Sequence, residues 1–273
     1  MRLASFDNGR LGVLVGKDTV RDVTNWALAQ CPRRVEDPLI ALIEAVRAGT
    51  TPQGPEHSRT SMRLGPPLRH PSKIIAAANY LRHTQEMNPG IAALGGIREK
   101  GFFLKAPSSI IGPGDAIRLP FADRRTDHEA ELAVIMGRVT RSVSEHDALA
   151  YVFGYTCLLD ITVRGKEDRG LRKSFDTFTP LGPYVTTRDE VPDPNDLAIE
   201  CRINGEVRQQ DSTRSMTMQV PALIAWISSV MTLLPGDVIA TGTPAGVGPI
   251  QPGDRIQVMI ERLGTLAVTV EAM

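Results

Sequence analysis

The sequence predicts an α+β fold that is rich in β-strands, with a small N-terminal β domain attached to a larger second domain. Pro-Gly-Asp occurs at residues 113–115, 235–237 and 252–254, and a strand-like run follows each time. Pro and Gly at the two central positions specify a type II turn, so these repeats mark turns that lead into strands of a sheet. No Gly-rich phosphate loop follows a strand, and no strand–helix alternation continues long enough for a doubly wound sheet.

The first 70 residues are predicted to form the smaller unit. Residues 2–6 and 11–15 are short apolar runs joined by Asp7-Asn8-Gly9, which is a strong hairpin signal, and a third strand is expected near 19–23. Residues 50–72 are polar and rich in Pro and Gly, which is typical of a linker on the surface. We therefore expect two domains, residues 1–70 and 71–273.

Helices are expected at three places between the strands. Asp37 followed by Pro38 favours a helix start, and Gly49 favours its end. A second helix is predicted to begin near Ser144, with Asp147 three residues on, and a third to span 221–232. The strands expected around them are Ala116–Leu119, Val238–Ala240 and Arg255–Ile260 after the Pro-Gly-Asp turns, and a hairpin of 198–203 with 206–208 around Asn204-Gly205.

The composition excludes several classes of protein. Basic and acidic residues balance at 31 each, so no net charge draws the chain to nucleic acid or to an anionic membrane. No apolar run reaches the roughly 18 residues that a transmembrane helix needs. Cys31, Cys157 and Cys201 have no metal-binding spacing, so we expect reduced thiols in a cytoplasmic protein.

Two carboxylates enter an apolar strand. Residues 126–136 are predicted to form one strand, in which Asp127, Glu129 and Glu131 share a face and both faces are apolar beyond Glu131. Like charges two residues apart that approach a core repel each other and lose hydration, so protons, basic side chains or a cation must neutralise them. The alternative is a solvated strand end, since carboxylates are rarely buried.

A third carboxylate, Asp160, ends the long apolar stretch 151–159. Three carboxylates without a Cys or His pattern suit an oxygen-preferring cation such as Mg²⁺, Mn²⁺ or Ca²⁺, and they do not suit a structural zinc. Glu129, Glu131 and Asp160 are therefore the candidate metal ligands.

One His–Glu pair has the spacing of an acid–base pair. If the turn after Tyr80 is helical, His83 and Glu86 stand three residues apart on one face and can meet. A carboxylate beside a histidine raises its basicity and orients its ring, which is what a water-activating base needs. The alternative is an exposed pair on a surface turn.

Six groups of residues, in order across about residues 71–270, resemble the fumarylacetoacetate hydrolase superfamily. They are Asn79-Tyr80 with His83 and Glu86; 103–109 followed by 112–115; 127–132; 154–156 with Asp160 and Arg164; 173–177 with 180–183; and 241–248.

The resemblance implies a mixed β-sandwich roll as the catalytic domain at 71–273, a small N-terminal β domain, and a homodimer. It implies Glu129, Glu131 and Asp160 as ligands of Mg²⁺ or Mn²⁺ (or of Ca²⁺ in crystals), and His83 and Glu86 as the water-activating pair on a lid. It assigns Lys173 to the substrate oxygens. The further substrate contacts that it implies are Thr243, Lys105, Asn79, Arg82 and Arg164; for Lys105, Asn79 and Arg82 the alternative is a structural salt bridge or hydrogen bond.

The chemistry implied by the resemblance is the hydrolysis of a C–C bond in a 2,4-dioxo acid, an acylpyruvate from aromatic catabolism. A cation that binds the C1 carboxylate and C2 oxygen stabilises the enolate that leaves when the C3–C4 bond breaks. The same enolate forms in an isomerase or decarboxylase of a 2-hydroxy-dienedioate or of oxaloacetate, so these activities stay open. A protein that binds a keto acid without turnover is disfavoured by the presence of all three carboxylates, the His–Glu pair and Lys173.

The loop between Arg164 and Lys173 departs from the family pattern. It lacks the Gln that often binds substrate there and carries Lys166, Arg169 and Arg172 instead. We hypothesise that these cations receive a distal carboxylate, as in fumarylpyruvate; the alternative is a solvated charged loop. We also expect residues 84–101 to form a lid that is mobile without ligand.

Overall fold

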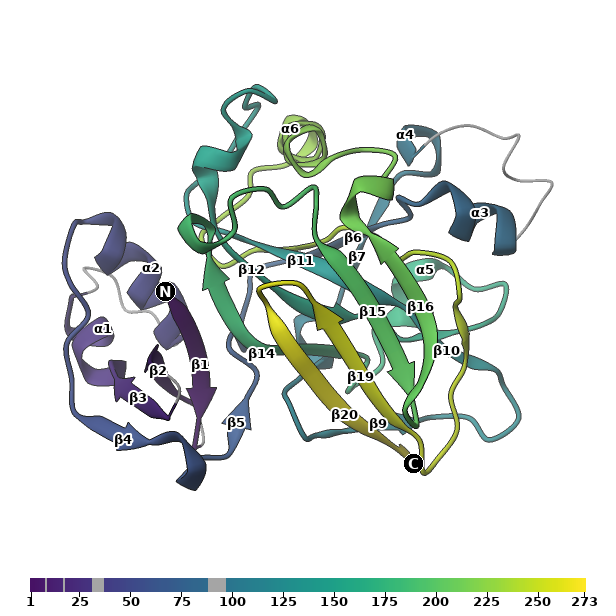
Figure 1. Ribbon diagram of the computed structural model, residues 1–273. Helices are drawn as coiled ribbons and strands as arrows, with labels where there is room; N and C mark the ends of the chain where they lie inside the picture. Colours follow the sequence, from purple (N-terminus) through teal and green to yellow (C-terminus); the bar gives the residue numbers. More distant parts are fainter. Residues whose placement is uncertain (8, 17, 31–36, 88–96) are drawn as a thin grey trace.

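The computed structural model describes residues 1–7, 9–16, 18–30, 37–87 and 97–273 (Figure 1). Three sequence predictions fall partly outside these residues: Asn8 of the first hairpin turn, Cys31, and positions 88–96 of the expected lid. Strands dominate the described chain, which confirms the predicted α+β, β-rich class.

A 12-stranded mixed sheet runs through both halves of the molecule in the order β4-β3-β2-β1-β14-β12-β11-β17-β6-β7, while β5 pairs with β1 and β8 pairs with β14. Its strands are β1 (Arg2–Phe6), β2 (Arg10–Val15), β3 (Thr19–Asp22), β4 (Glu56–Ser58), β5 (Leu64–Gly65), β6 (Ile74–Ala77), β7 (Phe102–Lys105), β8 (Ile110–Ile111), β11 (Ala130–Met136), β12 (Val152–Leu159), β14 (Thr179–Thr187) and β17 (Val238–Ala240).

Two smaller sheets complete the β structure. A three-stranded sheet has the order β13-β10-β18, and a five-stranded sheet has the order β16-β15-β19-β20-β9. Their strands are β9 (Ala116–Leu119), β10 (Thr126–His128), β13 (Thr162–Val163), β15 (Ala198–Ile203), β16 (Glu206–Ser212), β18 (Gly248–Pro249), β19 (Arg255–Ile260) and β20 (Gly264–Ala272).

The predicted turns are present where the sequence placed them. Gly114, Gly236 and Gly253 of the Pro-Gly-Asp repeats have φ of 78°, 85° and 96°, as the third position of a type II turn requires, and strands β9, β17 and β19 follow them. Asn204 and Gly205 both have positive φ and join β15 to β16, which extends to Ser212, four residues beyond the predicted end.

The helices agree with the sequence in part. Asp37 caps α2 by accepting a hydrogen bond from Leu39 N at 2.9 Å, with Pro38 in the first turn. The helices are α1 (Thr24–Gln30), α2 (Pro38–Arg47), α3 (Leu81–Met87), α4 (Ile97–Lys100), α5 (Arg169–Lys173) and α6 (Val220–Val230), with 3₁₀ turns at Arg59–Ser61, Pro107–Ser109, Ala148–Tyr151, Arg188–Glu190 and Thr213–Ser215. None of the helices in the described residues is long and apolar enough to cross a membrane.

Two sequence predictions are wrong. No α-helix begins near Ser144; its hydroxyl donates to Asp147 Oδ2 at 2.7 Å and closes a turn, after which only the 3₁₀ turn Ala148–Tyr151 forms. Residues 50–72 are also not a plain linker, because β4 pairs with β3 and β5 pairs with β1. The backbone hydrogen bonds of this stretch are thus partly supplied by the N-terminal strands.

The N-terminal unit continues the large sheet. Strand β1 pairs antiparallel with β14, with Leu3 opposite Val185, and Leu3 shares a hydrophobic cluster with Ala133 and Leu158 of the central strands. Figure 1 shows β1–β4 with α1 and α2 on one side of the molecule and the curved sheets of residues 73–273 on the other. A second, larger hydrophobic cluster fills the space between the curved sheets and α6. A division of the chain near residue 70 stays a prediction.

Candidate active site

One cavity of about 290 Å³ collects most of the residues that the sequence predicted to be functional. It lies where the end of β6, helices α3, α4 and α5, and the loop after β17 surround the junction of β10 and β11. Its lining residues are Ala77, Ala78, His83, Thr84, Lys100, Phe103, Glu129, Glu131, Asp160, Arg164, Arg169, Arg172, Lys173 and Thr243.

The three predicted metal ligands meet at the floor of this cavity. The predicted strand 126–136 is interrupted at Glu129, which lies between β10 and β11, and Asp160 follows the last residue of β12. Antiparallel pairing of Ala130 with Leu159, and a hydrogen bond from Asp160 N to Glu129 O of 2.8 Å, bring the carboxylates together. One carboxylate oxygen from each residue lies within 4.8 Å of the others, and none of the side chains is more than 3% exposed. This buried, oxygen-only cluster suits a hard divalent cation.

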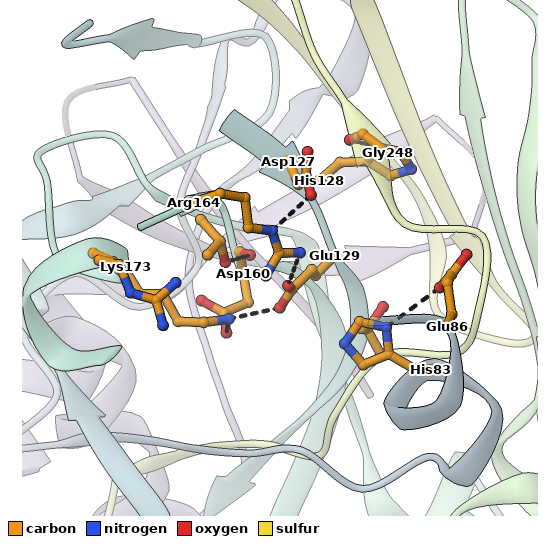
Figure 2. A network of polar contacts seen from close by, with 12 residues as sticks. His83, Glu86, Asp127, His128, Glu129, Asp160, Arg164, Lys173 and Gly248 are labelled. Carbon is orange, nitrogen blue, oxygen red and sulfur yellow. Dashed lines mark hydrogen bonds and ion pairs between the residues drawn. The ribbon is translucent and has the colours of Figure 1, made fainter. Parts of the chain in front are cut away.

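Basic side chains compensate these buried charges (Figure 2). Lys173 Nζ donates to Glu129 Oε2 at 2.6 Å and to Asp160 Oδ2 at 2.5 Å, and Lys105 Nζ donates to Asp160 Oδ1 at 2.6 Å. Arg164 joins Glu129 Oε1 at 2.8 Å to Asp127 Oδ2 at 2.7 Å. Cationic donors therefore hold both oxygens of Glu129 and of Asp160, as buried carboxylates require.

The neighbouring charges move the pKa values of two of these carboxyl groups apart. Burial alone raises the pKa of Glu129, but the nearby charges of Lys173 and Arg164 outweigh it and lower this pKa to about 2. Burial and the repulsion from Asp160 raise the pKa of Glu131 well above its ordinary 4.5, although Gly242 N donates to Glu131 Oε2 at 2.7 Å. Glu129 is thus ionised at neutral pH, while Glu131 holds its proton more tightly than an exposed carboxyl group.

His83 and Glu86 both lie on α3, and of the two only His83 lines the cavity (Figure 2). His83 Nδ1 and Glu86 Oε2 are 3.5 Å apart, which is too long for a good hydrogen bond and marks a loose contact. Burial lowers the pKa of His83, so its imidazole is neutral at pH 7 and able to accept a proton. The Glu86 carboxylate also accepts from Gly246 N at 3.0 Å, and this bond ties α3 to the loop after β17.

Of the remaining candidate substrate contacts, some line the cavity and others lie outside it. Thr243 and Arg164 line the cavity, whereas Lys105 lies behind Asp160 and also donates to Phe178 O at 2.9 Å. Asn79 is not among the lining residues: both ends of its amide bind the backbone of Met218 at 2.8 Å, which is the structural alternative. Arg82 is exposed and does not line the cavity either.

Only two of the three cations of the loop between Arg164 and Lys173 line the cavity. Arg169 and Arg172 of α5 line the cavity, while Lys166 is exposed and outside it. Lys100 of α4 joins them, although sequence reasoning gave it no role because nothing local links it to a loop about 70 residues away. Thus three cations line the cavity in addition to those that touch the acidic cluster.

The chain is similar to known proteins of one family. Residues 73–271 match the family "Fumarylacetoacetate (FAA) hydrolase C-terminal". The chain is 42% identical to the maleylpyruvate hydrolase of Aquipseudomonas alcaligenes, with 100% of both chains covered. It is 39% identical to the mitochondrial oxaloacetate tautomerase of Xenopus laevis, over 77% of this chain and 69% of that one.

A solved structure resembles the whole chain. The crystal structure of maleylpyruvate hydrolase from Sphingobium sp. SYK-6, in complex with manganese(II) and pyruvate, has a TM-score of 0.83 and 41% identity, and covers 100% of this chain and 99% of that one. The family match over 73–271, together with full-length relatives above 40% identity, shows that this chain belongs to the fumarylacetoacetate hydrolase family.

Proposed function

We propose that this protein is a divalent-cation-dependent hydrolase that cleaves the C3–C4 bond of an acylpyruvate from aromatic catabolism, with maleylpyruvate as the first substrate to test. One observation carries the proposal: a buried carboxylate cluster and a neutral His83 paired with Glu86 line the same cavity. The full-length similarity to maleylpyruvate hydrolases supports this choice.

Glu129, Glu131 and Asp160 would hold the cation, and their carboxylate oxygens fit Mn²⁺ or Mg²⁺. When bound, the cation supplies Lewis-acid polarisation of the substrate's 2-oxo group and stabilises negative charge there. Manganese is favoured by the similarity to the manganese complex of the Sphingobium enzyme.

His83 is the proposed general base. Its neutral imidazole takes a proton from a water molecule that adds to the C4 carbonyl, and Glu86 orients the ring and stabilises the imidazolium that results. The C3–C4 bond then breaks with its electron pair on C3, and a proton returned to C3 completes pyruvate. The C4 fragment leaves as a carboxylic acid, so maleylpyruvate gives maleate and pyruvate.

Lys173 is proposed to hold the substrate's oxygens near the acidic cluster. Lys173 lines the cavity, and its ammonium contacts Glu129 and Asp160 at the floor. Burial alone lowers its pKa, but the charges of Asp160, Glu129 and Glu131 outweigh this and raise the pKa, so the group stays charged and can stabilise an oxyanion.

The cations of the cavity wall are proposed to select dicarboxylic substrates. Arg169, Arg172 and Lys100 contribute positive charge without touching the acidic cluster, and within the described residues their side chains donate to neutral oxygens: Lys100 O, Glu167 O, Val163 O and Thr84 Oγ1. An Arg guanidinium suits a carboxylate geometrically, because its fork donates two parallel hydrogen bonds. The distal carboxylate of maleylpyruvate or fumarylpyruvate would complete this arrangement.

Product analysis tests the proposed reaction. Metal-stripped protein with Mn²⁺ restored would be offered maleylpyruvate, acetylpyruvate, oxaloacetate and 2-hydroxyhepta-2,4-diene-1,7-dioate in turn. We expect maleylpyruvate and acetylpyruvate to give pyruvate and the matching acid in equal amounts, with the 18-oxygen of labelled water in the new carboxylate. Carbon dioxide or a shifted double bond without C–C cleavage would instead assign the site to a decarboxylase or isomerase.

A homodimeric state, activity with Mg²⁺ and the lid role of 84–101 are further proposals that rest on the family resemblance, and a cytoplasmic location is proposed from the three cysteines without metal-binding spacing. Gel filtration with light scattering would test the dimer. Hydrogen exchange with and without oxalate would test the lid, which uniform protection of the segment in both states would contradict.

A further inference from the structure

Gln209 reaches the active-site cavity from a different sheet. It lies on β16, an outer strand of the five-stranded sheet, and its side chain is fully buried. Its amide nitrogen donates to Thr243 Oγ1 and to Pro244 O, both at 2.8 Å, and its amide oxygen accepts from Ala130 N at 3.0 Å. Gln209 therefore joins the loop that carries Thr243 to the residue between the two glutamates of the acidic cluster.

The orientation of this amide is fixed by two independent partners. Ala130 N–H can only donate, so it must face the amide oxygen, and the Pro244 carbonyl can only accept, so it must face the amide nitrogen. A flipped amide would place donor against donor and acceptor against acceptor. The Gln209 amide is consequently a donor toward Thr243.

This donor limits what the Thr243 hydroxyl can do. A hydroxyl has one proton, and Gln209 occupies one of the lone pairs of Thr243 Oγ1, so the proton must point elsewhere. At rest it is donated to Ala130 O at 2.8 Å. Rotation about the Cβ–Oγ1 bond offers the same proton to an acceptor in the cavity, which Thr243 lines.

We infer that Gln209 is a positioning residue that makes Thr243 a hydrogen-bond donor to the carboxylate of a bound 2-oxo acid. The inference rests on the proposed function, because it requires an anionic oxygen beside Thr243. A carboxylate can only accept, so Thr243 binds it by donating its proton, and the Gln209 amide on one lone pair of Oγ1 keeps that proton directed away from Gln209. Gln209 acts through Thr243 and does not itself line the cavity.

A double-mutant cycle tests this role. The Kd of oxalate, a small dianion, would be measured by calorimetry at saturating Mn²⁺ for the wild type, Gln209→Met, Thr243→Val and the double variant. Each single change is expected to weaken binding about tenfold, the effect of losing one charge-assisted hydrogen bond. The double variant is expected to be no weaker than the single ones, because both changes remove the same interaction.

Three outcomes would overturn the inference. Effects that multiply to about a hundredfold in the double variant would mean that the two residues act independently. An equal loss of Mn²⁺ affinity in Gln209→Met, measured without oxalate, would mean that Gln209 only holds the strand of the glutamates. No oxalate binding by the wild type would remove the proposed function and this role with it.

Two further variants keep the result interpretable. Gln210→Met changes the next residue of the strand, which is exposed, and is expected to leave the Kd of oxalate unchanged within about twofold. Gln209→Glu keeps the shape of the side chain and an acceptor for Ala130 N but lacks the amide donors. If Gln209→Met does not fold, Gln209→Glu replaces it in the double-mutant cycle, and adding Thr243→Val to Gln209→Glu is then expected to cause no further loss of oxalate affinity.

Discussion

The charged side chains of the active-site cavity are paired in one region and, among the described residues, unpaired in another. The floor is the acidic cluster of Glu129, Glu131 and Asp160, and the outer wall is lined by Arg169, Arg172 and Lys100. On the floor, Glu129 and Asp160 are buried and each of their oxygens already has a cationic donor from Lys173, Lys105 or Arg164. On the wall, Arg169 and Arg172 are half-buried, and within the described part of the chain no ion pair joins them to a carboxylate.

This difference suggests that the floor carries the catalytic reaction and that the wall selects the substrate. Buried carboxylates whose partners are all in place are held rigidly, which favours a cation site. Arg169 and Arg172, which form no ion pair with the described residues, can receive the carboxylate of a ligand. Substitutions on the floor should therefore change kcat and metal affinity, while substitutions on the wall should change the KM of dicarboxylic substrates alone.

The largest effect is expected for Glu131→Gln. Removing one of three proposed ligands should weaken Mn²⁺ binding and lower kcat by more than about 10⁴-fold, beyond the loss of a general base alone. Metal titration by calorimetry and the turnover of maleylpyruvate would measure both. An active variant with the Mn²⁺ affinity of the wild type would separate Glu131 from the metal site.

His83→Ala should lower kcat by about 10² to 10⁴-fold while Mn²⁺ still binds, since His83 is placed as a base and not as a ligand. Exposed His146→Ala is the matched control and should keep full activity. Because burial lowers the pKa of His83, the neutral base is present at pH 7, and kcat/KM of the wild type should fall only below the ordinary pKa of 6.5. A loss that begins well above pH 7 would contradict the assignment.

Mn²⁺ binding should release a proton and weaken in acid. Burial and Asp160 raise the pKa of Glu131 above its ordinary 4.5, so its carboxyl group is protonated in the metal-free protein between that value and its raised pKa. The cation binds the deprotonated form, and affinity therefore falls as the pH drops through this window. Calorimetry in buffers of different ionisation enthalpy would count the protons; an uptake of protons would contradict the sign.

The smallest effect is expected on the wall. Arg169→Ala with Arg172→Ala should raise the KM for maleylpyruvate about tenfold and leave the KM for acetylpyruvate, which lacks a distal carboxylate, within about twofold. Lys166→Ala, which removes an exposed charge of the same loop outside the cavity, is the control. An equal change in KM for both substrates would show that Arg169 and Arg172 do not bind the distal carboxylate.

The same contrast explains what the sequence could predict. Glu129, Glu131 and Asp160 were recognisable because carboxylates that enter apolar strands need neutralisation, and this need is visible locally. The three Pro-Gly-Asp turns and the cap at Asp37 were equally local. Lys173 was suggested only by the family resemblance.

Residues that depend on tertiary packing were missed. Gln209 reaches Thr243 only because the β15–β16 hairpin packs against β11, and no spacing along the chain encodes that contact. Lys100 lies beside Arg169, whose guanidinium donates to Lys100 O, for the same reason. Near Ser144 the local signal misled, because a Ser–Asp pair that favours a helix cap also closes an isolated turn.

The most direct test of the account is the turnover of maleylpyruvate by metal-stripped protein before and after Mn²⁺ is restored, with pyruvate and maleate both quantified. The account predicts no products without the cation and equal amounts of pyruvate and maleate with it. Hydrolysis at the same rate without any divalent cation would contradict the central role given to Glu129, Glu131 and Asp160.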